Sequence, residues 1–168
     1  MKYVGVDPGK AGAFVVLDES ANLVEFLVMP MIGTEYNGKA IVDFLTKYKD
    51  DSHLFIENVK AVSGVPVSST SSFNFGFGVG LLHGIIQAME IPFTKIGVPV
   101  WQKTMWEGVQ IQTKANGKKD TKTMSTIAAR RLFPKETFLA TERSSVPHEG
   151  IVDAALIARH GYLTLTQK

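Results

Sequence analysis

Residues 1–20 have the sequence MKYVGVDPGKAGAFVVLDES. The apolar runs at 3–6 and 13–17 predict two buried β-strands, and the turn residues 8–12 between them predict a hairpin. Asp7 places a carboxylate at the end of the first apolar strand. Burying an ionised carboxylate without a partner costs several kcal/mol, so Asp7 requires a cation, hydrogen-bond donors or access to water. Two interpretations follow: a turn-initiating Asp before Pro8, or a metal or phosphate site at a strand end.

The rest of the chain alternates between strand and helix patterns. Short apolar runs predict further strands over 23–29, 53–56 and 93–98, and helical spacing predicts helices over 38–48, 73–89, 100–108, 121–132 and 147–161. We expect Ser71 or Ser72 to cap the helix over 73–89. Pro147 suits the first position of the last helix, and Gly161 suits its end unless the helix runs on to Leu163. A chain of 168 residues is too short for two ordinary domains, so we expect one domain over 1–168.

The composition excludes several classes of protein. The chain has no cysteine, which excludes a disulfide framework and a thiolate metal site. No apolar run reaches the roughly 18 residues needed to span a bilayer, and the first residues lack the pattern of a secretory signal. We therefore expect an intracellular, cytoplasmic protein without a membrane segment.

Positive charge is concentrated in one part of the chain. The net charge is +2, but residues 95–143 carry ten Lys and Arg against four acids, whereas the remainder is net acidic. Such a segment indicates a polyanion-binding surface or a solvated helix face. It contains Trp101 and Trp106, which we expect to be core anchors, with Lys103 pointing outward between them. The stretch 112–120 is basic, has many turn residues and is expected to be mobile until it meets a partner.

The expected helix over 73–89 has an unusual composition. Three phenylalanines alternate with glycines, and Gly76, Gly80 and Gly84 are spaced four apart. Each glycine costs about 1 kcal/mol relative to alanine inside a helix, so this pattern requires a reason. The spacing produces a smooth strip along which another backbone can approach, either the sheet or a second subunit.

Three more acidic residues stand where a carboxylate is unexpected. Glu57 closes the apolar strand over 53–56, as Asp7 closes the first strand. Glu149 and Asp153 are four residues apart and therefore share one face of the last helix. Asp153 also interrupts the apolar face that should pack on the sheet. A solvated rim position for Glu57 and a role for Glu149 at the positive end of the helix dipole are the simpler interpretations.

Together, these four carboxylates suggest a metal site. Ligands with oxygen donors alone suit Mg²⁺ or Mn²⁺ and do not suit zinc. In a site with two such ions, one activates a water molecule and the other stabilises the leaving oxygen of a phosphodiester. The sequence therefore suggests metal-dependent phosphodiester hydrolysis. His148 could orient the water or relay a proton, or it could be an ordinary surface histidine.

Three segments in this order resemble the RuvC-type Holliday junction resolvases of the ribonuclease H-like superfamily, especially the short phage-borne members. They are Val4-Gly-Val-Asp7-Pro-Gly9, Phe55-Ile-Glu57-Asn58 and His148-Glu149-Gly-Ile-Val-Asp153-Ala-Ala-Leu-Ile-Ala158. The resemblance implies an α/β fold with a central mixed sheet of about five strands and helices on both faces. It implies that Asp7, Glu57 and Asp153 are metal ligands, with Glu149 as a fourth.

The resemblance also implies partners. A homodimer would place two active sites on a branched DNA, the two-fold symmetric four-way junction, and the glycine-rich helix lies where the family builds its dimer contact. Lys103, Lys119 and Lys122 lie near positions where the family has basic residues facing DNA phosphates. We add Lys118 and Lys60, which adjoin these segments, to the expected DNA-binding residues.

The sequence departs from the bacterial enzymes at three places. Those enzymes usually have two aspartates three apart on the last helix, whereas position 150 here is Gly and the second acid is Glu149. Asn58, Val59 and Lys60 replace an aromatic wedge that follows the second acid. The serine-rich stretch over 63–72 is longer than expected, which widens the range of substrates to consider.

Other functions remain open at this point. A broader branched-DNA or flap endonuclease of the same fold is one, and a non-catalytic DNA-binding module is another. Actin-like kinases also begin with such a hairpin, but they need a second domain to close over nucleotide. The sequence contains no Gly-x-x-x-x-Gly-Lys-Ser/Thr loop, which argues against a P-loop enzyme.

Overall fold

The sheet is built outward from the first hairpin. In the computed structural model, which describes residues 1–59 and 68–167, β1 (Lys2–Asp7) pairs antiparallel with β2 (Ala13–Leu17). β3 (Leu23–Val28) continues the sheet antiparallel to β2. On the other side, β6 (Ser52–Glu57) pairs parallel with β1, and β7 (Phe93–Ile96) pairs parallel with β6. The resulting order β3-β2-β1-β6-β7 is the mixed five-stranded sheet that the resemblance implied.

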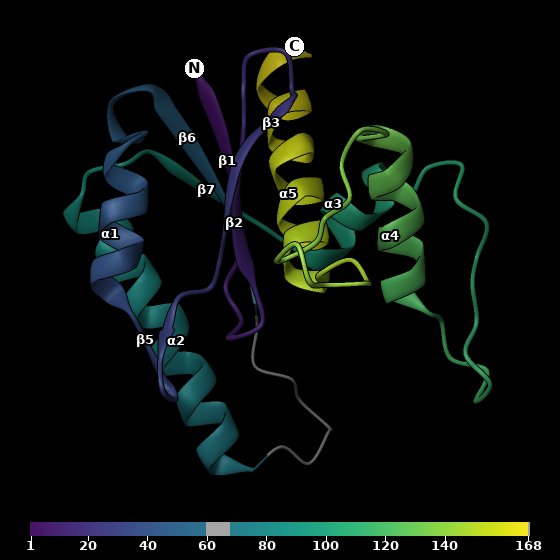
Figure 1. The fold of residues 1–168 in the computed structure, drawn as a ribbon, viewed down its shortest axis with the longest axis horizontal. Coiled ribbons are helices and arrows are strands. Elements are labelled where there is room, and N and C mark those ends of the chain that lie inside the picture. Colours follow the sequence, from purple (N-terminus) through teal and green to yellow (C-terminus); the bar gives the residue numbers. More distant parts are fainter. Residues whose placement is uncertain (60–67, 168) are drawn as a thin grey trace.

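Helices cover both faces of this sheet (Figure 1). One face carries α1 (Gly38–Thr46) and α2 (Ser69–Ala88). The other carries α5 (Glu149–Thr166), with α3 (Val98–Met105) and α4 (Thr121–Leu132) packed beyond it. A short 3₁₀ turn over Lys49–Asp51 leads into β6, and β4 (Met31–Ile32) pairs with β5 (Glu35–Tyr36) in a separate small hairpin.

Strand alternation divides the core into two clusters. Side chains point to opposite faces at successive positions of a strand. In β1 and β6, Val4, Val6, Leu54 and Ile56 therefore pack under α1 and α2. Phe55, with Tyr3, lies on the opposite face against α5. The same alternation directs Asp7 and Glu57 toward the α5 face, because each follows a residue of the α1–α2 cluster.

Helix α5 lies directly on β1. A Cβ added at Gly5 would overlap the backbone of Ala154 and Ala158, and one at Gly161 would overlap the ring of Phe55. Gly161 is therefore an internal packing position rather than a helix end, and α5 continues past it to Thr166. The predicted end at Gly161 is wrong because close contact with the sheet, and not helix termination, requires glycine there. The alternative that the helix runs on through Leu163 is confirmed.

Two predicted helix starts are also corrected. Helix α2 begins at Ser69, and Ser68 caps it by accepting a hydrogen bond from the Ser71 backbone N–H. The serine-rich stretch thus contributes the first turn of the helix, and Ser71 and Ser72 are not its caps. Helix α5 begins at Glu149 with His148 as its N-cap, so Pro147 precedes the helix and is not its first residue.

The glycine strip of α2 faces away from the sheet. Leu82 and Ile86 are the α2 side chains buried against the sheet. Nothing lies within 4 Å of a Cβ added at Gly76, Gly80 or Gly84. Packing of this strip on the sheet is therefore excluded. Phe73 and Phe77, which are 71% and 58% exposed, lie along the same solvent-facing side.

Among residues 1–59 and 68–167, no helix combines the length and apolar character that crossing a membrane requires.

Candidate functional site

The strand register brings two of the predicted acids side by side. Val6 of β1 pairs with Ile56 of β6 in the parallel ladder, so Asp7 and Glu57 are the next residues on neighbouring strands. Neighbouring strands lie about 4.8 Å apart, and both carboxylates point to the α5 face. Asp7 and Glu57, which each end an apolar strand, therefore lie next to each other at the carboxyl-terminal edge of the sheet.

Helix α5 contributes the third carboxylate. A Cβ at Gly150 would overlap the turn between β1 and β2, whereas Ala154 and Ala158 lie over Gly5 in the middle of β1. The helix therefore runs antiparallel to β1, and Asp153 lies above the strand end that carries Asp7. Oδ1 of Asp153 is buried and has no hydrogen-bond partner among the described residues. A buried, unpartnered carboxylate oxygen is costly unless it meets a cation.

The three carboxylates perturb one another. Burial raises the pKa of Glu57 to about 7, and the neighbouring charges of Asp7 and Asp153 contribute to this increase. Burial likewise raises the pKa of Asp153 to about 6, with Asp7 and Glu149 adding to the effect. The pKa of Asp7 is raised by burial, although the Gly9 backbone N–H and His148 oppose the shift. Clustered acids with raised pKa values are typical of functional sites.

Glu149 lies at the exposed rim of this cluster. Its Oε2 is 2.6 Å from the ammonium of Lys122, and the two side chains are 59% and 62% exposed. The charge of Glu149 contributes to the raised pKa of Asp153, which places the two residues within electrostatic range. The prediction that Glu149 and Asp153 share one helix face is confirmed, but in this structure Glu149 is neutralised by a lysine.

Position 150 has no room for a carboxylate. A Cβ there would overlap the backbone of Ala11 and Gly12 in the β1–β2 turn. Gly12 is equally constrained, because a Cβ there would overlap the backbone of Asp7. Position 150 therefore cannot carry an aspartate unless the β1–β2 turn moves, and the other acid in the first turns of α5 is Glu149, four residues before Asp153.

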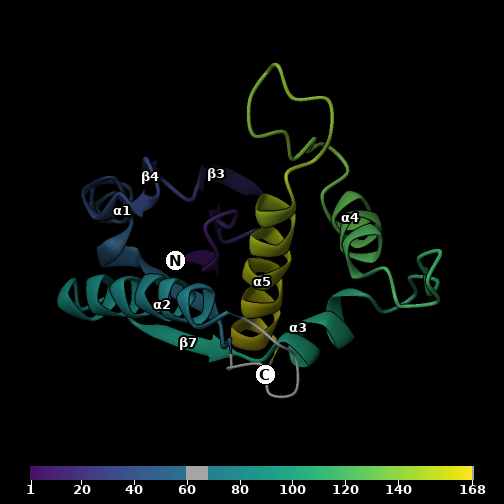
Figure 2. The ribbon, with the colours of Figure 1, turned by 90° about the horizontal axis from the view of Figure 1, so that it is seen from below.

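His148 lies at the junction of the loop and helix α5. Its Nδ1 accepts a long hydrogen bond of 3.4 Å from the Ile151 backbone N–H, which caps the helix. Its own backbone N–H donates to the Phe138 carbonyl, at 2.8 Å. Figure 2 shows the segment between α4 and α5 projecting beyond this end of the helix. The imidazole is thus held at the start of α5, within electrostatic range of Asp7, with Nε2 as its second nitrogen.

Two aromatic residues that sequence reasoning did not assign to the site contact its carboxyl edge. The indole Nε1 of Trp101 donates a 3.1 Å hydrogen bond to Oε2 of Glu57. The hydroxyl of Tyr36 donates to the carbonyl of Pro8, directly after Asp7, at 3.3 Å. A buried indole or phenol usually needs a hydrogen-bond acceptor, so the sequence could have indicated that Trp101 and Tyr36 each have one. It could not have indicated which residue that acceptor is.

The donor set fits a hard divalent cation. Asp7, Glu57, Asp153 and Glu149 offer oxygen ligands, which Mg²⁺ and Mn²⁺ prefer. The unpartnered Oδ1 of Asp153 and the mutual repulsion of the partly buried acids are features that a cation would relieve. Across residues 1–59 and 68–167, no three His, Cys, Asp or Glu side chains are already gathered at metal-binding geometry. The fit therefore rests on donor chemistry and burial.

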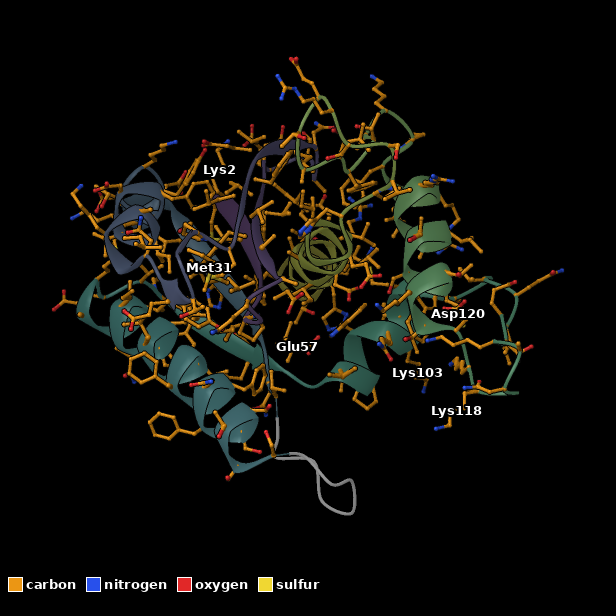
Figure 3. The ribbon with its side chains drawn as sticks, turned by 60° about the horizontal axis from the view of Figure 1, so that its bottom comes forward. Lys2, Met31, Glu57, Lys103, Lys118 and Asp120 are labelled. Carbon is orange, nitrogen blue, oxygen red and sulfur yellow. The ribbon has the colours of Figure 1, made fainter. Side chains whose placement is uncertain are left out.

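The predicted basic surface extends from the acidic edge toward α4. Lys103 on α3 and Lys119 line one surface hollow of about 370 Å³, and the Lys119 ammonium lies 4.7 Å from the centre of the Trp106 ring. Figure 3 shows Lys103 and Lys118 on the same side of Glu57 as α4. Lys122 completes this set through its pair with Glu149. Lys60 lies outside the described residues.

The stretch over 112–120 has internal structure. Thr113 and Lys119 form an isolated β-bridge, and the Lys114 N–H donates to the Lys118 carbonyl at 2.8 Å. A turn with Gly117 at φ +75° closes the loop. Local backbone hydrogen bonds therefore shape this stretch, and its mobility before it meets a partner stays a prediction.

Comparisons with known proteins identify the fold. Two solved structures of RuvC from Thermus thermophilus are similar to the chain over nearly its whole length. The first shares 16% sequence identity with a TM-score of 0.64 and covers 99% of this chain and 97% of the RuvC chain. The second is described as RuvC in complex with Holliday junction substrate; it shares 14% identity with a TM-score of 0.62 and covers 98% and 95%. The chain therefore has the RuvC-type fold. No protein-family model and no curated protein sequence matches it.

Proposed function

We propose that this chain is a metal-dependent endonuclease that resolves four-way DNA junctions, with residues 1–168 forming one nuclease domain that acts in the cytoplasm. One observation carries the proposal: Asp7 and Glu57 end neighbouring parallel strands, Asp153 lies on the helix above them, and these three partly buried carboxylates raise one another's pKa values. The similarity in fold to RuvC supports it, because that similarity extends over nearly the whole chain.

The acidic cluster would bind the catalytic cations. Asp7, Glu57 and Asp153 would hold Mg²⁺, or Mn²⁺ as a substitute, and Glu149 would join them when it leaves Lys122. Two bound ions would supply activation of water and stabilisation of the leaving oxygen of the phosphodiester. The protein itself supplies a rigid carboxyl edge, because Asp7 and Glu57 follow paired positions of the strand ladder and Asp153 is held by the close packing of α5 on β1.

His148 is suited to move a proton at this site. Its Nδ1 is engaged by the Ile151 backbone N–H, so the imidazole presents Nε2 as the nitrogen that can contact water. His148 also opposes the rise in the pKa of Asp7, which reflects how close the two residues are. Because Nδ1 is the acceptor, the neutral imidazole carries its proton on Nε2, and we assign His148 to orienting a water molecule or donating a proton from Nε2–H.

The basic surface next to the acids would position DNA. Lys103, Lys118, Lys119 and Lys122 are exposed cations on α3, α4 and the loop between them. Contacts between lysines and phosphates fix the position of a duplex without reading its sequence. Lys60 is assigned to the same role from its sequence position alone. A RuvC of similar fold has been solved with a Holliday junction substrate, which favours branched DNA as the partner.

A homodimer would pair two such sites on one junction. The solvent-facing side of α2 carries Phe73, Phe77 and the strip of Gly76, Gly80 and Gly84. Glycines at this spacing allow close approach of a second helix, and two exposed phenylalanines supply apolar area for an interface. We assign this face to a two-fold contact between copies of the chain.

Cleavage of defined DNA substrates tests the proposal. Labelled four-way, three-way, flap and linear duplex DNA would be incubated with Mg²⁺ and then Mn²⁺, with wild type and with Asp7→Asn. Asp43→Asn is the matched control, because Asp43 is an exposed acid paired with Lys39 on α1. We expect metal-dependent cleavage of the four-way junction that Asp7→Asn abolishes and Asp43→Asn retains. Equal cleavage of every branched substrate would instead favour a broader nuclease, and tight binding without cleavage would favour a DNA-binding module.

A further inference from the structure

Glu57 is the one acid of the cluster that a buried tryptophan contacts. Trp101 is 1% exposed, and its Nε1 donates to Oε2 of Glu57 at 3.1 Å. An indole N–H can only donate, and when buried it almost always finds an acceptor. The acceptor here is a carboxylate, so the bond is charge-assisted whenever Glu57 is ionised.

The position of the indole is itself fixed. One residue, the cap Gly97, separates the end of β7 from the start of helix α3, and Pro99 lies in the first turn of the helix. The Trp101 ring packs edge-to-face against Trp106, with centroids 6.2 Å apart and planes at 76°. Trp101 therefore presents its N–H from a rigid, packed ring.

Glu57 needs such a donor more than the other acids do. The Gly9 backbone N–H donates to Oδ1 of Asp7 at 3.3 Å, so a turn already orients that carboxylate. Glu57 has a longer side chain and is repelled by the charges of Asp7 and Asp153. Burial and the two neighbouring charges raise the pKa of Glu57, whereas the hydrogen bond from Trp101 lowers it and so favours the ionised carboxylate. The bond occupies Oε2 and leaves Oε1 as the second oxygen of the carboxylate.

We propose that Trp101 is a positioning residue whose indole N–H orients the Glu57 carboxylate for binding a divalent cation. The inference rests on the proposed function for the presence of a cation at these acids. It goes beyond that function because it makes metal affinity depend on Trp101, which is neither an acidic ligand nor one of the proposed DNA-binding residues. Partners that orient metal ligands typically change metal affinity or activity by about 10–100-fold when they are removed.

The chain contains its own matched control. Trp106 is buried in the same cluster, but its Nε1 has no hydrogen-bond partner among the described residues. Trp101→Phe and Trp106→Phe make the same chemical change in one aromatic pair, and only the first removes a bond to Glu57. Mn²⁺ binding would be measured by calorimetry without DNA, after circular dichroism has established that both variants are folded.

We expect Trp101→Phe to weaken Mn²⁺ binding by about 10-fold or more and Trp106→Phe to leave it within about two-fold of wild type. In cleavage assays, Trp101→Phe should raise the metal concentration for half-maximal rate, with the KM for DNA unchanged. In a Glu57→Gln background, Trp101→Phe should have no further effect on Mn²⁺ binding. Equal Mn²⁺ affinity in the two tryptophan variants would overturn the inference.

A second measurement needs no change at Trp101. The chain has two tryptophans, so Trp106→Phe leaves Trp101 as the sole indole emitter. Adding Mn²⁺ should quench or shift this emission with the midpoint found by calorimetry. Emission that does not respond while calorimetry registers binding would contradict the inference, even if Trp101→Phe failed to fold.

These readouts separate the inference from the proposed function. Wild type that binds Mn²⁺ but cleaves no DNA would defeat the proposed function, and the comparison of the two variants would still support Trp101 as a positioning residue. Wild type that cleaves junctions while both variants bind Mn²⁺ equally would preserve the function and defeat the inference.

Discussion

The ammonium of Lys122 lies 2.6 Å from Oε2 of Glu149 and joins the first turn of α4 to the first turn of α5. The pair connects the basic surface to the acidic cluster, because the charge of Lys122 also lowers the pKa of Asp153. Glu149 in turn raises the pKa of Lys122. If Glu149 is a metal ligand, as we propose, Lys122 and a divalent cation would compete for the same carboxylate.

Replacing Lys122 by Met should separate metal binding from DNA binding. Removing the competing ammonium should strengthen Mn²⁺ binding several-fold in the absence of DNA. Junction binding should weaken, and its logarithmic salt slope should fall by about 1, because one phosphate contact is lost. Stability should change by less than about 1 kcal/mol, since the pair is exposed. Lys135→Met, another lysine of the basic segment, is the control, and weaker binding of both ligands by Lys122→Met would contradict this account.

The raised pKa values predict how stability depends on pH in the metal-free protein. Burial and the charge of Asp7 raise the pKa of Glu57 from 4.5 to about 7, so the folded state retains a proton that the unfolded chain releases. This stabilisation is complete below the unfolded pKa and is lost as pH rises through the folded value, at roughly 1.4 kcal/mol per pKa unit. Asp153 contributes in the same direction, with its pKa raised to about 6.

Urea unfolding in EDTA between about pH 5 and pH 8 measures this effect. We expect the unfolding free energy of wild type to fall over this interval and that of Glu57→Gln to fall less, because the amide does not titrate. Glu25→Gln is the control, since the pKa of Glu25 is lowered by Lys47 and Tyr48 rather than raised. Parallel profiles for wild type and Glu57→Gln would mean that Glu57 is not buried among like charges.

Gly150→Ala should destabilise the protein. The added Cβ would overlap the backbone of Ala11 and Gly12, which cannot move without displacing the end of β1. Such overpacking costs about 1–3 kcal/mol, and this exceeds the roughly 1 kcal/mol that alanine gains over glycine in a helix. Unfolding by urea provides the measurement. Unchanged or greater stability would show that α5 does not lie on the turn as described.

A bulky charge on the glycine strip should affect association and leave the fold intact. Nothing lies within 4 Å of a Cβ at Gly80, so Gly80→Arg meets no clash within one protomer. We expect sedimentation to find wild-type dimers and Gly80→Arg monomers with an unchanged circular dichroism spectrum. Thr46→Arg places the same charge on an exposed position of the neighbouring helix α1 and should remain dimeric. A dimeric Gly80→Arg variant would exclude this face as the interface.

Sequence patterns predicted most of the sheet because its strands are short apolar runs between turn residues. The strands over 3–6, 13–17 and 53–56 all lie within observed strands. The small hairpin β4–β5 was missed, since two-residue strands have no periodicity to detect. The early start of α2 was missed because serine is a weak helix former, and its helical role here depends on the cap at Ser68.

The site was predictable only in part, for a similar reason. A carboxylate that ends or interrupts an apolar run is visible in the sequence, so Asp7, Glu57 and Asp153 could be proposed as site residues from the sequence. Trp101 was predicted to be a core anchor, and its burial is confirmed. Its bond to Glu57 joins residues 44 positions apart, and only the chain path through α2 and β7 brings them together. Pairing of Glu149 with Lys122 similarly depends on how α4 packs against α5.

Mapping the nicks in a four-way junction tests the central claim most directly. Each strand of a symmetric junction would be labelled in turn and incubated with Mg²⁺ and either wild type, Asp153→Asn or the control Asp43→Asn. We predict paired nicks at symmetric positions on two opposing strands for wild type and Asp43→Asn, and none for Asp153→Asn. Nicks that are unpaired, that occur equally in linear duplex, or that persist in Asp153→Asn would contradict a junction resolvase with its active site at these carboxylates.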